Sequence, residues 1–159
     1  MLVKAFRHIG IFLVAALLAV ACSVPSARDL SLTSVEVAYV LPTSLRSMDG
    51  KLLLGIENRT IGFAVQEISG SIRYQDKPIA TFVTGAVEVQ GRSRQVYELP
   101  CTVTLAEGAS LLDVLVIASK RSWEGLRADI DIQAALKKNS RLLRKPFSYK
   151  DVEISRFTK

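Results

Sequence analysis

The sequence is poor in the two residue types on which many catalytic and metal sites depend. Its 159 residues include one histidine, His8, and two cysteines, Cys22 and Cys101. His8 lies in an N-terminal segment that we predict to be removed, and the remaining chain has no other histidine. Catalytic sites of the Ser-His-Asp and Cys-His types are thereby excluded, and Cys101 alone cannot supply the ligands of an ordinary zinc site. P-loop, dinucleotide-binding and EF-hand motifs are absent as well, so we expect no enzyme activity, no catalytic residue, no metal and no cofactor.

A strong charge of either sign is also missing. Lysine and arginine number 21 and aspartate and glutamate 15, which gives a net charge of +6. Removal of the segment that carries Lys4 and Arg7 leaves 19 basic against 15 acidic residues, a net charge of +4. This excess is too small for a dedicated nucleic-acid-binding protein. The length of the remaining chain is enough for one domain with a sizeable core.

The first 21 residues have the layout of a secretory signal peptide. Lys4 and Arg7 form a short positive start, an uncharged run follows at 9–20, and small residues stand at Ala19 and Ala21. This order of positive, apolar and small residues is typical of signal peptides. The apolar run is too short for a membrane-spanning helix, which needs about 20 apolar residues.

Residues 18–22, Leu-Ala-Val-Ala-Cys, resemble the lipobox of bacterial lipoproteins. In that family the thiolate of the cysteine, here Cys22, is alkylated by diacylglycerol, and the leader is cut immediately before it. The family favours leucine three positions before the cysteine, whereas here Ala19 holds that place and Leu18 precedes it. The resemblance implies a chain anchored by lipid on Cys22, and Ser23 after it implies the outer membrane, facing the periplasm. The alternative is ordinary cleavage that leaves Cys22 as a free thiol.

The rest of the chain divides into a tether and a domain rich in strands. Residues 22–31 are small and polar and contain a proline, which predicts a short flexible tether. Over residues 32–159 the dominant hydrophobic period is two, which is typical of β-strands. The predicted strands are 32–39, 51–58, 67–74, 78–83, 87–89, 95–105, 126–136 and 144–155, with polar turns at 75–78, 90–93 and 138–140.

One segment departs from the strand pattern. Ser110 and Asp113 have the spacing of a capping box, and the apolar residues after them predict a helix up to Arg121, with a strand as the alternative. Antiparallel strands with one short helix predict a mostly β fold, an immunoglobulin-like or fibronectin-III-like β-sandwich.

The strand pattern also predicts where individual side chains lie. Alternation in the first strand places Val35, Val37 and Tyr39 on its inward face. The same alternation makes Cys101 a buried thiol that packs as a small hydrophobic side chain, the alternative being a reactive thiol in an oxidising compartment. Pro100 has no amide hydrogen, so we expect its strand to be an edge strand or to bulge there.

The middle of the chain has the pattern of a known domain family. The segment KLLLGIENRTIGFAVQEISGSIRYQDKPIATFVT, followed by EVQGRSRQVYELPCTVTL, resembles late embryogenesis abundant group 2 proteins and their water-stress and hypersensitive-response (WHy) domain. The resemblance covers residues 32–154 and implies a sandwich with a helix and no catalytic residues. Joined to a lipoprotein leader, such domains are similar to a group common in Gram-negative bacteria. Family members usually carry Asn-Pro after the second strand, whereas this chain has Asn58-Arg59, which implies a less rigid turn.

Two groups of charged residues are candidate sites. Six bases lie between Asp131 and Asp151 with no acid among them: Lys137, Lys138, Arg141, Arg144, Lys145 and Lys150. On a hairpin they would cluster, either to contact phosphate groups of lipid or lipopolysaccharide or as a solvated hairpin that resists edge-to-edge pairing. Asp129 and Asp131 share one strand face, which fits a solvated face or, alternatively, a catalytic or calcium-binding carboxylate pair.

Together these features predict a lipid-anchored, non-enzymatic β-sandwich of the bacterial cell envelope. We expect it to act as a binding or accessory module of a membrane-associated assembly. Its expected partners are the membrane, through the lipid, and an envelope protein, with no nucleic acid. Two alternatives stay open: a folded stress-protective protein of the group 2 type, and an unrecognised envelope hydrolase.

Overall fold

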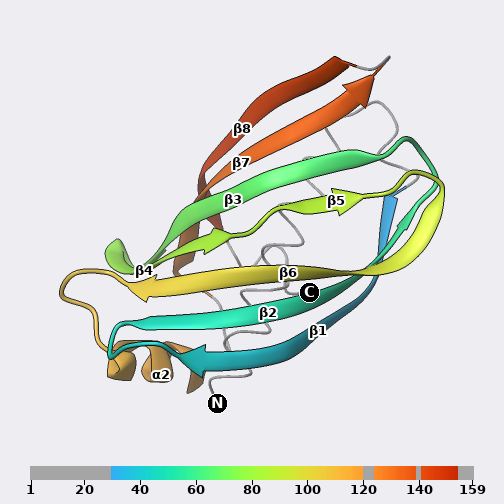
Figure 1. The fold of residues 1–159 in the computed structure, drawn as a ribbon. Coiled ribbons are helices and arrows are strands. Elements are labelled where there is room, and N and C mark those ends of the chain that lie inside the picture. The colour runs from blue at the N-terminus through green and yellow to red at the C-terminus, as the bar shows by residue number, and fades with distance from the viewer. Residues whose placement is uncertain (1–29, 120–123, 139–140, 154–159) are drawn as a thin grey trace.

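The computed structural model describes residues 30–119, 124–138 and 141–153. The predicted signal peptide, Cys22 and most of the predicted tether lie outside these residues. Within them, no helix is long and apolar enough to cross a membrane. The described elements, labelled in Figure 1, are β1 (Leu30–Pro42), β2 (Ser47–Asn58), β3 (Phe63–Tyr74), β4 (Lys77–Thr84), β5 (Val87–Val89), β6 (Ser93–Leu105), α2 (Leu111–Ser119), β7 (Leu126–Lys138) and β8 (Arg141–Glu153).

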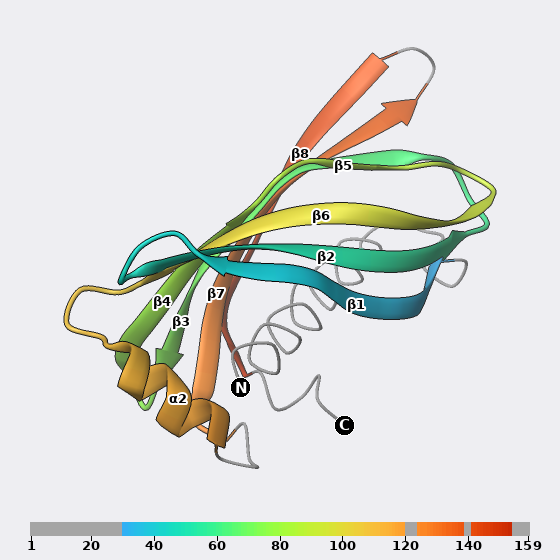
Figure 2. The same cartoon turned by 60° about the horizontal axis from the view of Figure 1, so that its bottom comes forward.

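All the strands of the described residues belong to one antiparallel sheet. Its order is β1-β2-β6-β4-β3-β7-β8, and β5 pairs with the beginning of β3. Figures 1 and 2 show that the sheet is strongly twisted and curled. The prediction of a mostly β, antiparallel fold with one short helix is confirmed, and the layers of the expected sandwich are joined in one hydrogen-bonded sheet.

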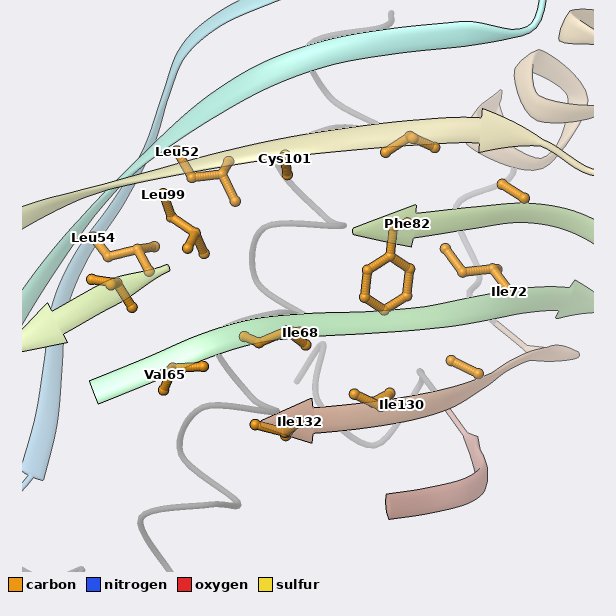
Figure 3. Close-up of a cluster of buried hydrophobic side chains, with 14 of the residues drawn as sticks. Leu52, Leu54, Val65, Ile68, Ile72, Phe82, Leu99, Cys101, Ile130 and Ile132 are labelled. Atoms are coloured by element: carbon orange, nitrogen blue, oxygen red, sulfur yellow. The ribbon is translucent and has the colours of Figure 1, made fainter. Parts of the chain in front are cut away.

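The hydrophobic core lies on the inner face of this sheet. Leu52 of β2, Leu99 of β6, Ile68 of β3 and Ile132 of β7 are fully buried. Figure 3 shows these side chains gathered with the ring of Phe82 from β4. Burial of one such side chain contributes about 1.5–3 kcal/mol, so the packing of this face is the main source of stability. The period of two in the sequence is the direct result of this one-sided burial.

Two strands begin four residues earlier than the sequence predicts. β2 begins at Ser47 instead of residue 51, and β3 begins at Phe63 instead of residue 67. The additional residues are held by pairing with β6 and β7, which lie far away in the chain. The predicted turn between β3 and β4 is confirmed, and Gln75 and Asp76 adopt positive φ angles of 48° and 66° there.

The predicted capping box begins α2. The Asp113 amide donates to Ser110 Oγ at 3.3 Å, and the Ser110 amide donates to Asp113 Oδ2 at 2.8 Å. These reciprocal contacts satisfy amides that have no partner within the helix. The helix prediction is confirmed over Leu111–Ser119 and the strand alternative is wrong there, while residues 120 and 121 of the predicted helix lie outside the described residues. Ile117 packs into the core, and Lys77 of β4 pairs with Asp113 at 3.4 Å. Figure 2 shows α2 at one end of the sheet.

The inward position predicted for Tyr39 is wrong. Val37 packs against the core as expected, but a register shift follows it, and Tyr39 pairs with Lys51 on the outer face. Tyr39 is 41% exposed, with Lys51 Nζ 5.9 Å from the centroid of its ring. Val40 takes the inward place against the core. A bulge reverses the face of every later side chain, and the alternating pattern of the sequence does not reveal it.

The prediction that Pro100 marks an edge strand or a bulge is also wrong. β6 lies between β2 and β4, and its pairing with β2 has no register shift. Pairing with β4 ends at Thr84 opposite Cys101, and the Gly85 amide then donates to the Pro100 carbonyl at 2.8 Å. Within a strand the amide and carbonyl of one residue point to the same side, so the missing donor of Pro100 faces the place where β4 has ended. The Gly85–Pro100 pair therefore makes one hydrogen bond where an ordinary antiparallel pair makes two, and the loss falls at the end of the β4–β6 ladder.

Candidate functional site

The strands run between two ends of the sheet that have different surfaces. One end, here called the near end, contains the beginning of β1, the loop 59–62 and the turn 90–92. The opposite end, here called the far end, contains the turn 43–46 and α2. Figures 1 and 2 agree that β1 starts at the near end and finishes at the far end, the end of the sheet at which α2 lies. The two ends are the candidate interaction surfaces.

The Asn58 side chain holds the loop 59–62 of the near end in place by hydrogen bonds. Its side chain is 1% exposed, and its Nδ2 donates to the Ile61 carbonyl at 3.0 Å and to the Gln90 carbonyl at 3.1 Å. Its Oδ1 accepts hydrogen bonds from the Thr60 amide at 2.9 Å and the Thr60 hydroxyl at 2.8 Å. From the sequence this turn is expected to be less rigid, because the family's proline is missing. The buried amide of Asn58 holds it instead.

The neighbouring turn 90–92 is fixed to the same loop. The Arg92 amide donates to the Thr60 carbonyl at 3.0 Å, and Tyr97 Oη accepts from the Gln90 amide at 3.0 Å. A Cβ atom on Gly91 would lie 2.7 Å from the Gly62 nitrogen and 2.7 Å from the Thr60 carbonyl oxygen. Only glycine permits so close an approach, so the two loops form one packed unit.

The loop pair and the beginning of β6 present three exposed arginines and one exposed apolar side chain. Ile61 is 54% exposed, and the Arg59 side chain is 71% exposed and pairs with Glu57 at 2.9 Å. Arg92 and Arg94 are exposed too and form no ion pair within the described residues. Arg92 has a φ of 50°, a left-handed conformation that costs a residue with a Cβ about 1–2 kcal/mol relative to glycine.

The basic residues predicted from the sequence lie on the hairpin of β7 and β8. Its register places Lys138 opposite Arg141, Lys137 opposite Leu142, Ala135 opposite Arg144 and Ala134 opposite Lys145. Only the backbone of these five basic residues is described, and it ends at the near end of the sheet (Figure 1). Lys150 lies beyond this group and pairs with Asp131 Oδ2 at 3.3 Å.

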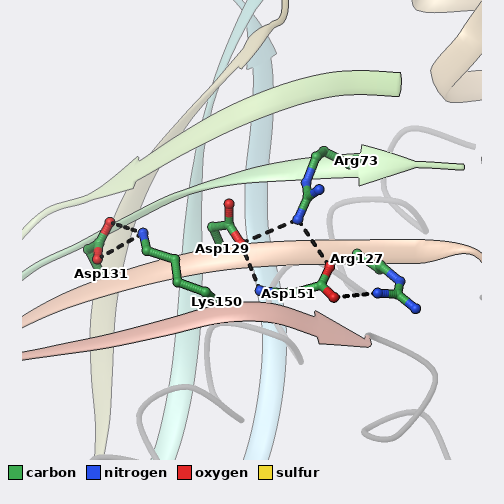
Figure 4. Close-up of polar contacts among 6 residues, drawn as sticks. All are labelled: Arg73, Arg127, Asp129, Asp131, Lys150 and Asp151. Carbon is green, nitrogen blue, oxygen red and sulfur yellow. Dashed lines mark hydrogen bonds and ion pairs between the residues drawn. The ribbon is translucent and has the colours of Figure 1, made fainter. Parts of the chain in front are cut away.

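Asp129 and Asp131 each have protein partners on the outer face of the sheet (Figure 4). Asp129 accepts from Arg73 at 3.4 Å and from the Asp151 amide at 2.8 Å. Asp131 accepts from the Ser148 hydroxyl at 2.5 Å, and this hydrogen bond, with the nearby Lys150, lowers the pKa of Asp131. The two carboxylates therefore act separately, on different partners. Among residues 30–119, 124–138 and 141–153, no group of three or more His, Cys, Asp or Glu could hold a metal ion.

The far end has an apolar surface. Leu45 in the turn between β1 and β2 is 87% exposed, and Leu41 near the end of β1 is 57% exposed. On α2, Leu112 is 71% and Val116 55% exposed. Leu112 and Val116 are four residues apart and share one face of the helix, while Ile117 faces the core. The face of α2 that carries Leu112 and Val116 is therefore apolar and exposed. Exposed apolar patches are typical of interaction surfaces.

Cys101 is the buried thiol that the sequence predicts. Its exposed fraction is 4%, it forms no disulfide, and burial raises its pKa to about 12. A thiol with this pKa carries almost no thiolate near neutral pH, so it is chemically inert there. The predicted lipidation site, Cys22, lies outside the described residues.

Sequence patterns give only part of this site. The basic hairpin and the capping box follow from spacing, whereas the near-end loop pair depends on contacts between residues 58–62 and 90–92. The signal available beforehand is weak: a polar Asn-Arg-Thr segment followed by Gly62, and a second glycine at Gly91. Neither segment predicts that the other is its partner.

Comparison with known proteins gives structural likeness only. The sequence matches no protein-family model and no curated protein. A crystal structure of a protein from Archaeoglobus fulgidus is similar at 12% identity and a TM-score of 0.41, over 76% of this chain and 94% of that one. A solution structure from Arabidopsis thaliana is similar at 14% identity and a TM-score of 0.35, over 76% and 77%. A yeast GAE domain is similar at 8% identity and a TM-score of 0.30, over 76% and 96%.

Proposed function

We propose that the chain is a lipid-anchored, non-enzymatic module of the bacterial envelope. Cys22, acylated after removal of residues 1–21, would hold the domain at the outer membrane on the periplasmic side. The observation that carries this proposal is the segment 18–22, in which small residues precede a cysteine directly after an apolar run. Diacylglycerol chemistry requires a thiol at that place, and no other cysteine lies near it.

The short connection to the sheet supports a location close to the bilayer. β1 begins at Leu30, eight residues after Cys22. A fully extended chain of that length spans at most about 28 Å. Several acyl chains, at about 0.8 kcal/mol for each buried CH₂ group, contribute on the order of 20–30 kcal/mol, so the attachment is effectively permanent.

The surfaces support a binding or accessory role better than catalysis. Asp129 and Asp131 are engaged by cationic or hydroxyl partners, and the Cys101 thiol is buried with a pKa of about 12. The uncovered apolar side chains of the far end, Leu45 and Leu112, suit contact with an envelope protein. The module would thus hold a partner near the membrane.

The anchor is tested by incorporation of radioactive palmitate in cells. Wild-type protein should be labelled and should partition into detergent, and Cys22→Ala should lose both properties. Cys101→Ala is the matched control, since it removes a cysteine from the core and should leave labelling unchanged. Labelling that persists in Cys22→Ala would contradict the proposal.

A further inference from the structure

The tether determines which end of the domain lies at the membrane. β1 starts at the near end, so the lipid on Cys22 is joined to that end. β2 has 12 residues and is about 40 Å long at 3.3 Å per residue. The tether spans at most about 28 Å, which is less than the length of the sheet. The loop pair of the near end is therefore held close to the lipid headgroups.

The charge of this loop pair suits an anionic surface. The loop pair and the strand ends beside it, residues 57–62 and 88–94, contain three arginines, Arg59, Arg92 and Arg94, against two acids, Glu57 and Glu88. Glu57 pairs with Arg59 and is also the cross-strand neighbour of Arg94, and the excess is one positive charge. Guanidinium groups bind phosphate oxygens in a bidentate manner. Ile61 of the same loop pair is 54% exposed and can enter the apolar boundary below the headgroups.

The conformation of Arg92 is a second, independent indication. Its φ of 50° is held by the hydrogen bond from its amide to the Thr60 carbonyl. Glycine would adopt this conformation without steric cost, and a side chain kept there despite strain is typical of functional positions. Arg92 is exposed, so its guanidinium group is available to bind a ligand.

We propose that this loop pair is a second membrane contact, in which Arg92 and Arg94 bind the phosphate groups of anionic lipid and Ile61 enters the interface. This inference rests on the proposed anchoring through Cys22. It orients the domain, with the near end on the bilayer and the apolar far end turned away from it. The backbone of the hairpin that carries the five bases at 137–145 ends at the same end of the sheet (Figure 1).

The test compares two labelled positions in the full, lipidated protein. Ile61→Cys places a thiol at the near end and Leu45→Cys at the far end, and each is modified with the same fluorophore. Cys101, with a pKa of about 12 and 4% exposure, stays unreactive near neutral pH, and an acylated Cys22 has no free thiol. The proteins are placed in vesicles of phosphatidylcholine, with or without phosphatidylglycerol, that carry a nitroxide quencher on the headgroup.

The expected result is strong quenching at position 61 and little at position 45, with more quenching at 61 when phosphatidylglycerol is present. Addition of Arg92→Gly and Arg94→Gln should lower the equilibrium constant for headgroup contact about thirtyfold in anionic vesicles, since each base contributes to binding near such a surface. Equal quenching at the two positions would overturn the orientation. Quenching at 61 that ignores both lipid charge and the arginine variants would overturn the phosphate contact.

Failure of the anchor has a different signature from failure of the contact. If Cys22 carried no lipid, it would itself take up the fluorophore in the wild-type protein, and both proposals would fall. If Cys22 is acylated and only the quenching pattern fails, the anchor stands and the near-end contact is rejected.

Discussion

At the near end of the sheet, two loops are fastened to each other by a buried amide side chain, whereas at the far end a helix is fastened by a capping box and one apolar face. Asn58 makes four hydrogen bonds at the near end and leaves arginines at the surface. α2 buries Ile117 at the far end and leaves Leu112 at the surface. The same sheet thus supports a polar, positively charged end and an apolar end.

The difference shows how one curled sheet can serve two kinds of contact. Polar loops that satisfy their own backbone groups can face lipid headgroups and water without loss of structure. Exposed apolar side chains gain free energy only when another apolar surface covers them. The first arrangement suits a membrane surface, and the second suits a protein partner.

The largest expected loss of stability comes from removal of the Asn58 side chain, which holds the near-end loops together. Asn58→Ala leaves the Thr60 amide and the Ile61 and Gln90 carbonyls without their partner, so the free energy of unfolding should fall by about 3 kcal/mol. Urea denaturation of the purified protein measures this loss. Gln95→Ala, which removes an exposed amide of the same end, should change stability by less than about 0.5 kcal/mol. Equal effects from the two variants would show that the near end is not built around Asn58.

Substitution on the buried face of α2 should lower the free energy of unfolding, whereas substitution on its exposed face should leave it nearly unchanged. Ile117→Ala removes a core side chain, which should lower the free energy of unfolding by about 2 kcal/mol. Leu112→Ala, on the exposed face of the same helix, should change it by less than about 0.5 kcal/mol. Both values come from thermal or urea unfolding. A large loss in Leu112→Ala would mean that this face packs against the protein itself, and it would no longer be available to a partner.

A smaller effect of opposite sign is expected at Arg92. Arg92→Gly keeps the amide that bonds to Thr60 and removes the steric cost of a positive φ. The gain is partly offset by the greater freedom of glycine in the unfolded chain, so stability should rise by about 0.5 kcal/mol. The shift of the urea midpoint measures it. A clear loss of stability would mean that the Arg92 side chain serves the fold, which would remove one support for its contact with lipid.

The smallest effect concerns the pH dependence of the far end. Hydrogen bonds from the Ser110 amide and hydroxyl, together with Lys77, lower the pKa of Asp113 below 3.8 in the folded state. The carboxylate therefore stabilises the fold above pH 3.8, and this contribution is lost as the pH falls through the folded pKa. Asp113→Asn and Ser110→Ala should each make unfolding free energy less dependent on pH in that acid range. Unchanged acid dependence in both variants would contradict this role.

The sequence predicts the repetitive parts of the fold well because their information is local. Alternation along β6 predicts the burial of Cys101, and the spacing of Ser110 and Asp113 predicts the start of α2. Both follow from neighbours within one element. By contrast, Tyr39 faces outward because of a bulge, and Pro100 is tolerated inside the sheet because β4 ends beside it. These outcomes depend on a second strand that local patterns do not specify.

The candidate site divides in the same way. The lipobox-like segment and the run of bases are contiguous in the sequence, so both can be predicted from it. The near-end loop pair brings Thr60 next to Arg92 and Asn58 next to Gln90. These residues are about thirty positions apart in the sequence, so their contact depends on the tertiary fold and not on local pattern. The uncovered face of α2 is likewise visible only when the inner face is known.

The attachment of Cys22 is the premise on which the comparison of the two ends depends. Its most direct test is the intact mass of the protein extracted from membranes. The predicted result is a chain that begins at Cys22, without residues 1–21, and carries the mass of its acyl groups on that residue. A chain that retains the first 21 residues, or one that begins at Cys22 with an unmodified thiol, would contradict the account.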